Sequence, residues 1–218
     1  MKKIILVYHQ IDEKDPFMSV TLDTFKKQID YLKNQHFNFC DINELMKKNN
    51  GNHVCIMFDD GYKSIIPALG YMKQNNLKYS IAIIENKLNK RSYLNQKDLD
   101  GSLYFHTKNH LDLTKLSNEK LKDELICDYS YYSKCLVYPM GKYNENVINA
   151  VKENYKYGLS LLPFHVTNKS RNYELPRICI NGYLSMLKFK MFVSKLGNIY
   201  LHLAFLKRKL LRQDYLSK

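Results

Sequence analysis

The sequence predicts a single domain with an α/β fold built around a largely parallel sheet. Short apolar runs of strand length alternate along the chain with longer segments that have helical periodicity. The 218 residues are enough to bury a full core in one large domain. No internal repeat, low-complexity tract or Pro/Gly-rich linker divides the chain.

The expected elements alternate between strands and helices. An apolar strand is expected at residues 2–8, and residues 21–35 form an amphipathic helix for which Thr21 is a suitable N-cap. Further strands are expected at residues 39–42, 54–58, 79–84, 103–105, 136–138, 157–161 and 177–180. Further helices are expected at residues 42–48, 64–75, 117–126 and 144–154. This alternation is typical of βαβ units.

The chain is strongly basic, with a formal net charge of +13 and a pI near 9.3. Such a charge indicates an acidic partner, which is a nucleic acid, an anionic lipid or a negatively charged glycan or its carrier. The sequence contains no helix-turn-helix, zinc-finger or RNA-binding signature, so no nucleic-acid partner is expected.

The cysteines and the N-terminus bear on the compartment. The five cysteines are scattered and form no CxxC pair, which excludes a zinc ribbon and a disulfide framework and favours reduced thiols. The apolar run at residues 4–7 is too short for a signal-peptide core, and no apolar stretch reaches membrane-spanning length. We therefore expect a cytoplasmic protein, at the inner face of the membrane if it binds lipid.

The C-terminal segment differs from the rest. Residues 184–212 have helical periodicity and carry seven basic side chains, with no acidic one before Asp214. Gly197-Asn198 is expected to break this segment into two helices. We divide the chain into residues 1–183 and a basic amphipathic tail at residues 184–218. Such a tail suits an anionic membrane surface, or it is a closing helix packed on the domain with a solvated basic face.

Two adjacent carboxylates follow the apolar strand at residues 54–58. Asp59 and Asp60 precede Gly61, which ends the strand. Paired carboxylates at a strand end repel each other and lose water, so a fold tolerates them poorly unless a cation or a proton lies between them. The alternative is an Asp-Gly turn with a solvated acid beside it.

A second cluster is His106-Thr107-Lys108-Asn109-His110. Two histidines four residues apart lie on the same face of a helical turn and can bind one metal ion from one side. This spacing alone is weak evidence, because surface helices produce it by chance. The acid pair at another strand end strengthens it by offering a further ligand.

Six segments occur in an order that resembles the NodB-type polysaccharide deacetylases, a carbohydrate esterase family, and within it the branch that acts on surface polysaccharides. They span roughly residues 4–180, and their combination is more specific than any one of them. The segments are Val7-Tyr8-His9, Phe58-Asp59-Asp60-Gly61-Tyr62, His106-Thr107-Lys108-Asn109-His110, Leu111 to Ser117, Val137-Tyr138-Pro139-Met140-Gly141-Lys142-Tyr143-Asn144 and Leu175-Pro176-Arg177-Ile178.

The resemblance implies a distorted (β/α)7 barrel with its site at the carboxyl ends of the strands. By position, Asp60, His106 and His110 would bind a divalent metal, usually Zn²⁺. Asp59 would be the general base, and the strand-end His9 is our first candidate for the general acid. A backbone N–H near Met140 is suited to hold the oxyanion. The expected oxyanion and substrate residues are Tyr138, Pro139, Met140 and Arg177.

The chain departs from the family pattern at three places. Met140 stands where the family has a site tyrosine. The stretch between Ile84 and His106 is too short for the usual helix, so we expect a partly trimmed barrel with a more open site. No late leucine-x-histidine motif supplies the usual general acid, for which His165 and His202 are substitutes.

The function expected from the resemblance is metal-dependent removal of an N-acetyl group from an amino sugar. The substrate would be a surface glycan, such as lipopolysaccharide or capsule, or its cytosolic lipid- or nucleotide-linked precursor. The alternative keeps the fold without catalysis, as a deacetylase-like protein that binds glycan or a partner. A nucleic-acid-binding protein is the third reading and rests on net charge alone.

Overall fold

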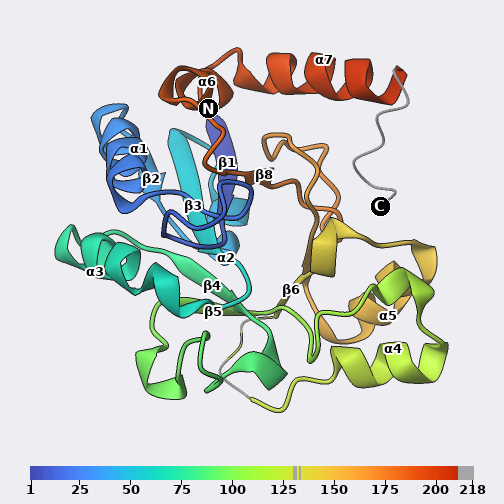
Figure 1. Cartoon of the computed structure of the whole chain (residues 1–218). Coiled ribbons are helices and arrows are strands. Elements are labelled where there is room, and N and C mark those ends of the chain that lie inside the picture. The colour runs from blue at the N-terminus through green and yellow to red at the C-terminus, as the bar shows by residue number, and fades with distance from the viewer. Residues whose placement is uncertain (130–131, 133, 211–218) are drawn as a thin grey trace.

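The computed structural model describes residues 1–129, 132 and 134–210. Its centre is a curled parallel sheet in the order β7-β6-β5-β4-β3-β1-β8, with the short β2 paired to β3 off this path (Figure 1). The strands are β1 (Lys2–Tyr8), β2 (Asn38–Phe39), β3 (Asn52–Phe58), β4 (Ser80–Ile83), β5 (Ser102–Phe105), β6 (Cys135–Val137), β7 (Tyr157–Leu159) and β8 (Ile178–Cys179). All neighbouring pairs on the path are parallel, as the alternating sequence pattern predicted.

One segment joins the two edges of this sheet. Residues 172–177 run beside β7, where Leu175 N–H donates to the Gly158 carbonyl and Ser160 N–H donates to the Leu175 carbonyl, both at 2.9 Å. The chain then continues into β8, which pairs with β1 in the register Leu6↔Ile178. The fold is therefore a partial (β/α) barrel, which confirms the predicted fold class.

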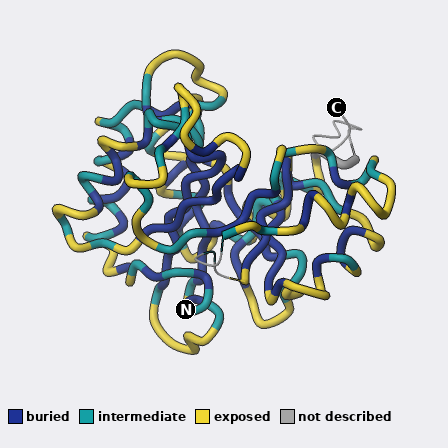
Figure 2. The backbone as a smooth tube through the Cα atoms, turned by 90° about the horizontal axis from the view of Figure 1, so that it is seen from below, coloured by how far each residue is buried: buried dark blue, intermediate teal, exposed yellow. Residues whose placement is uncertain are grey.

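Helices α1 (Leu22–Asn34), α3 (Ile66–Gln74), α4 (Asn118–Leu125) and α5 (Glu145–Asn154) pack on the outer side of the sheet. Helix α2 (Ile42–Lys47) instead contributes Ile42 and Leu45 to the cluster inside the barrel. As predicted, Thr21 caps α1 by accepting from the Thr24 N–H. Asp41, which was expected to lie in a strand, instead caps α2 in a capping box with Glu44. Side chains alternate along each strand, so Ile4 and Leu6 of β1 pack toward α1 and α3. The buried chain gathers in the middle, with exposed loops around it (Figure 2).

The predicted trimming is present between β4 and β5. Two short 3₁₀ helices, Glu85–Lys87 and Gln96–Asp98, take the place of a full helix there. Tyr104 of β5 is fully buried in the cluster inside the barrel, and its hydroxyl accepts from the Ile42 N–H at 2.8 Å. This tyrosine links the trimmed side of the barrel to the start of α2.

The C-terminal segment forms α6 (Met186–Phe192) and α7 (Gly197–Leu210). The break between them lies at residues 193–196, earlier than predicted, because Gly197 begins α7 rather than interrupting it. The rest of the predicted tail, residues 211–218, lies outside the described residues, and the division at residue 183 stays a prediction. No helix among the described residues is long and apolar enough to span a bilayer.

Candidate active site

The two aspartates lie where β3 ends, and they separate there. Asp59 continues the row of Cys55 and Met57 that faces the barrel interior, and its N–H donates to the Tyr8 carbonyl at 2.9 Å. Asp60 has a φ of 70°, in the left-handed region that residues other than glycine seldom adopt. This turn lets both carboxylates stay at the same end of the barrel, although neighbours in a strand point to opposite faces.

The histidines lie in a loop that follows β5. His106 N–H donates to the Ile83 carbonyl at 2.9 Å, which extends the pairing of β5 with β4 by one residue. The prediction of a helical turn over 106–110 is wrong, because Thr107 and His110 have φ values of 64° and 62° and the segment is not helical. The two left-handed residues bend the loop so that both imidazoles meet Asp60.

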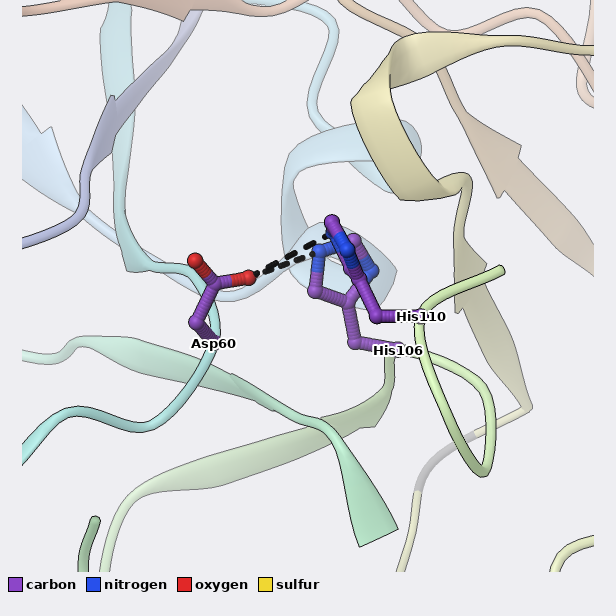
Figure 3. Close-up of side chains that lie close together, drawn as sticks. All are labelled: Asp60, His106 and His110. Carbon is purple, nitrogen blue, oxygen red and sulfur yellow. Dashed lines mark ion pairs between the residues drawn. The ribbon is translucent and has the colours of Figure 1, made fainter. Parts of the chain in front are cut away.

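Asp60, His106 and His110 form one compact cluster (Figure 3). Asp60 Oδ1 lies 3.3 Å from Nε2 of His106 and 3.6 Å from Nε2 of His110. Burial raises the pKa of Asp60, but the interaction with His106 and the nearby histidine charges outweigh it, and its pKa falls to about 2. Asp60 is therefore a carboxylate at neutral pH.

This cluster has the features of a divalent metal site. Its three ligand atoms lie within 4.8 Å of one another. Asp60 Oδ1 is buried and receives no aligned hydrogen bond within the described residues. His106 Nδ1 lies 2.8 Å from the Val137 carbonyl, which directs Nε2 toward Asp60 in the way that outer partners orient metal-ligating histidines. Two imidazoles and one carboxylate suit zinc and leave coordination positions open, so the residues fit the expected metal.

Asp59 is paired with Arg177 inside the barrel. Nη1 of Arg177 lies 2.9 Å from both carboxylate oxygens of Asp59, and each residue is 1% exposed. The Nε of Arg177 also donates to the Ser160 carbonyl at 2.8 Å. Sequence reasoning placed Arg177 among the substrate and oxyanion residues, whereas the structure buries its guanidinium against Asp59. Arg177 thus holds and orients Asp59.

Residues outside the predicted set hold the histidine loop. The buried carboxylate of Glu124 on α4 accepts from both the backbone and the side-chain amides of Asn109. From the other side, Glu85 N–H donates to the Thr107 carbonyl at 3.1 Å and Asn86 N–H donates to the Lys108 carbonyl at 3.0 Å. The loop is therefore clamped between the start of the trimmed stretch and α4. No sequence motif points to this clamp, because Glu124 lies in the last turn of α4 among other charged residues and only the structure shows that it is buried.

The remaining predicted residues occupy different positions. His9 is half-buried at the end of β1, with its Nδ1 4.0 Å from the Cys179 sulfur, and its charge acts on Asp60. Tyr138 is fully buried, with its hydroxyl bonded to the Tyr173 carbonyl at 3.0 Å, and Pro139 is buried beside it. Met140 is 41% exposed with a φ of 55°, and its N–H has no acceptor within the described residues.

The two substitute general acids lie elsewhere. His165 Nε2 lies 2.7 Å from the Phe192 carbonyl, and the His202 ring stacks on Phe164 at 3.9 Å. Both belong to the packing of α7 on the barrel. The structure does not bring them to the Asp60 cluster, so His9 is the histidine that remains near it.

Known proteins are similar to this chain in sequence and in fold. Residues 46–158 match the model of the Polysaccharide deacetylase family. A poly-beta-1,6-N-acetyl-D-glucosamine N-deacetylase of Staphylococcus epidermidis is 28% identical over 229 residues, covering 82% of this chain and 79% of the relative.

Two solved structures share the fold. A polysaccharide deacetylase from Bacillus cereus superposes with a TM-score of 0.78 at 18% identity, over 89% of this chain and 69% of that one. A Streptococcus pyogenes deacetylase in complex with acetate gives a TM-score of 0.77 at 23% identity, over 85% and 95% of the two chains. The family match spans both aspartates, both histidines and the segment around Met140. This chain belongs to the polysaccharide deacetylase family.

Proposed function

We propose that this protein is a metal-dependent deacetylase that removes an N-acetyl group from an amino sugar. One observation carries the proposal: the Asp60, His106 and His110 cluster lies at the same barrel end as the buried pair of Asp59 and Arg177. A divalent metal bound by the cluster would polarise the acetyl carbonyl and lower the pKa of water toward about 7. Zinc is the metal that we propose.

The chain's own residues divide the remaining work. Asp59 accepts a proton from the attacking water, and Arg177 keeps its carboxylate in one orientation through two contacts at 2.9 Å. The free N–H of Met140 donates to the oxyanion that forms on the acetyl group. His9 donates a proton to the amine of the leaving sugar. The exposed side chain of Met140 replaces a tyrosine, so sugar contacts there are apolar.

The relatives and the composition support a proposal for the substrate and for where the protein acts. The Staphylococcus epidermidis relative is an N-deacetylase of poly-beta-1,6-N-acetyl-D-glucosamine, which supports a β-linked N-acetylglucosamine polymer or its precursor as substrate. Five free cysteines are found in the described structure, which favours a reducing compartment. We propose a cytoplasmic enzyme that acts on a lipid- or nucleotide-linked glycan precursor, with an anionic membrane surface as a partner of the basic tail.

The test is acetate release by the purified protein from oligomers of β-1,6-linked N-acetylglucosamine and from a nucleotide-linked N-acetyl sugar, with zinc added. Asp60→Asn and His110→Ala are expected to lose both bound metal and turnover. Asp59→Asn is the matched variant, because it is expected to keep the metal and lose turnover. Full activity in Asp60→Asn would exclude the metal assignment. Glycan binding without acetate release by the metal-loaded protein would favour the catalytically inactive alternative.

A further inference from the structure

Helix α7 has two apolar faces, and one of them packs on the barrel. Asn198 Oδ1 accepts from the His165 N–H at 2.9 Å, and the His202 and Phe205 rings contact the Phe164 ring at centroid distances of 3.9 and 5.2 Å. Leu201 is buried on the same side. Positions 198, 201, 202 and 205 follow helical spacing, so this face fixes how α7 lies on the protein.

The opposite face of α7 is also apolar and is exposed. Ile199, Leu203 and Leu206 are 60%, 62% and 53% exposed, and Leu196 before the helix is 69% exposed. Their spacing of three, four and three residues places them in one stripe. A stripe of large apolar side chains in water indicates a surface that another molecule covers.

The charges beside this stripe indicate what covers it. Between Glu174 and Asp214 the chain has no acidic residue, while residues 175–210 carry the basic residues Lys188, Lys190, Lys195, Lys207, Arg208 and Lys209 as well as the buried Arg177. Lys207 lies four residues after Leu203 and therefore beside the stripe, and Lys195 precedes Leu196. A second copy docked through the same stripe would bring these lysines together with no acid to balance them. An anionic lipid surface matches both the apolar stripe and the charge.

The position of α7 determines the orientation of the site relative to a surface on which α7 docks. Lys2, the first residue of β1, donates from Nζ to the Val193 carbonyl at 3.0 Å, and Val166 N–H donates to the Lys3 carbonyl at 2.8 Å. The chain that leads into α7 thus packs at the amino-terminal end of the strands, and Figure 1 shows α6 beside the N-terminus with α7 running on from it. The site follows the carboxyl ends of β3 and β5, about 20 Å away for a strand of seven residues.

We propose that the outer stripe of α7 docks on an anionic bilayer. The catalytic mouth, by which we mean the barrel end at the carboxyl ends of β3 and β5, then points away from the membrane. The inference rests on the membrane partner proposed above and makes its geometry specific. In this orientation the enzyme reaches a glycan that extends from the surface by about the length of the barrel. A sugar directly beside the lipid headgroups would lie at the wrong end of the protein.

The test is flotation of the full-length protein with phosphatidylcholine vesicles that contain or lack phosphatidylglycerol. Ile199→Ser/Leu203→Ser and, separately, Lys195→Gln/Lys207→Gln are expected to weaken binding to the anionic vesicles by about tenfold or more. Phe17→Ser is the matched control, because Phe17 is 60% exposed in the loop that follows β1 at the mouth end. It is expected to bind as well as the unmodified protein.

Three results would overturn the proposal. Loss of binding in Phe17→Ser with full binding in the stripe variant would place the mouth against the bilayer. Equal binding to vesicles with and without phosphatidylglycerol would exclude a role for anionic lipid in docking. A dimer in solution that Ile199→Ser/Leu203→Ser converts to a monomer would assign the stripe to a second copy. Acetate release from a soluble oligomer, measured on the same variants, is expected to be unchanged and reports on the deacetylase proposal separately.

Discussion

The pair of Asp59 and Arg177 makes a quantitative prediction about stability. Replacing Arg177 with methionine removes the cation that pairs with Asp59, a carboxylate that is 1% exposed, while retaining much of the side-chain volume. Breaking a buried ion pair by removing one partner leaves an uncompensated charge and typically destabilises a protein by about 3–5 kcal/mol. We expect Arg177→Met to lower the free energy of unfolding by that amount.

The loss of unfolding free energy in Arg177→Met can be measured as a fall in Tm against a surface control. For a chain of 218 residues, a loss of this size corresponds to a fall in Tm of roughly 6–20 °C. The control is Arg171→Met, because Arg171 forms an ion pair with Glu174 on the surface and is 78% exposed there. Its removal is expected to change the unfolding free energy by less than about 1 kcal/mol.

A double-mutant cycle separates the charge from the lost packing. Asp59→Asn/Arg177→Met removes both charges, so it is expected to be more stable than the sum of the single losses by about 2–3 kcal/mol. Denaturant unfolding of the four proteins, without added metal, gives this coupling energy. Strictly additive losses, or an Arg177→Met variant as stable as the unmodified protein, would refute the claim that Arg177 balances and positions Asp59.

Three further predictions concern the site. Glu124→Ala is expected to weaken metal binding by about 10–100-fold in a metal-competition titration, because the histidine loop loses its clamp, whereas Asp123→Ala at an exposed pair should change it little. Chelation should lower Tm, and metal at about 100 times its Kd should restore about 2.7 kcal/mol in the unmodified protein but not in Asp60→Asn. Gly141→Ala should lose about 1–3 kcal/mol in thermal unfolding, since Gly141 has a φ of 67° and an added Cβ would lie 2.7 Å from the Leu161 Cβ. Unchanged metal affinity in Glu124→Ala, a Tm that chelation does not change, or an unchanged Tm in Gly141→Ala would each contradict the corresponding prediction.

Much of the fold could be predicted from local patterns. The strand at residues 2–8 and the helix capped by Thr21 agree with the structure. Both are determined by the spacing of apolar residues close together in the chain, two residues apart in a strand and about 3.6 in a helix. The ends of short elements were less predictable. Residues 39–42 were expected to be a strand, but Asp41 caps α2 and the strand ends at Phe39. There the capping box outweighs the apolar pattern.

The composition of the metal cluster could be predicted, but its geometry could not. Four-residue spacing suggested a helical turn, and only left-handed backbone at Thr107 and His110 brings both imidazoles to Asp60. No propensity scale predicts that conformation for these residue types, because the surrounding contacts impose it. The partner of Asp59 was hidden for another reason. Arg177 is 118 residues away in the chain, and its role depends on the closure of the barrel.

The segment at residues 172–179 has a consequence for how the protein is made. During synthesis, β1 and β7 each present an unpaired edge until this segment emerges, and such edges favour association between chains. The same segment carries the arginine that neutralises Asp59. A nascent chain that has not reached Arg177 therefore has an open sheet and an unbalanced acid in its interior. Barrel closure and assembly of the catalytic base are expected to occur in a single late step of folding.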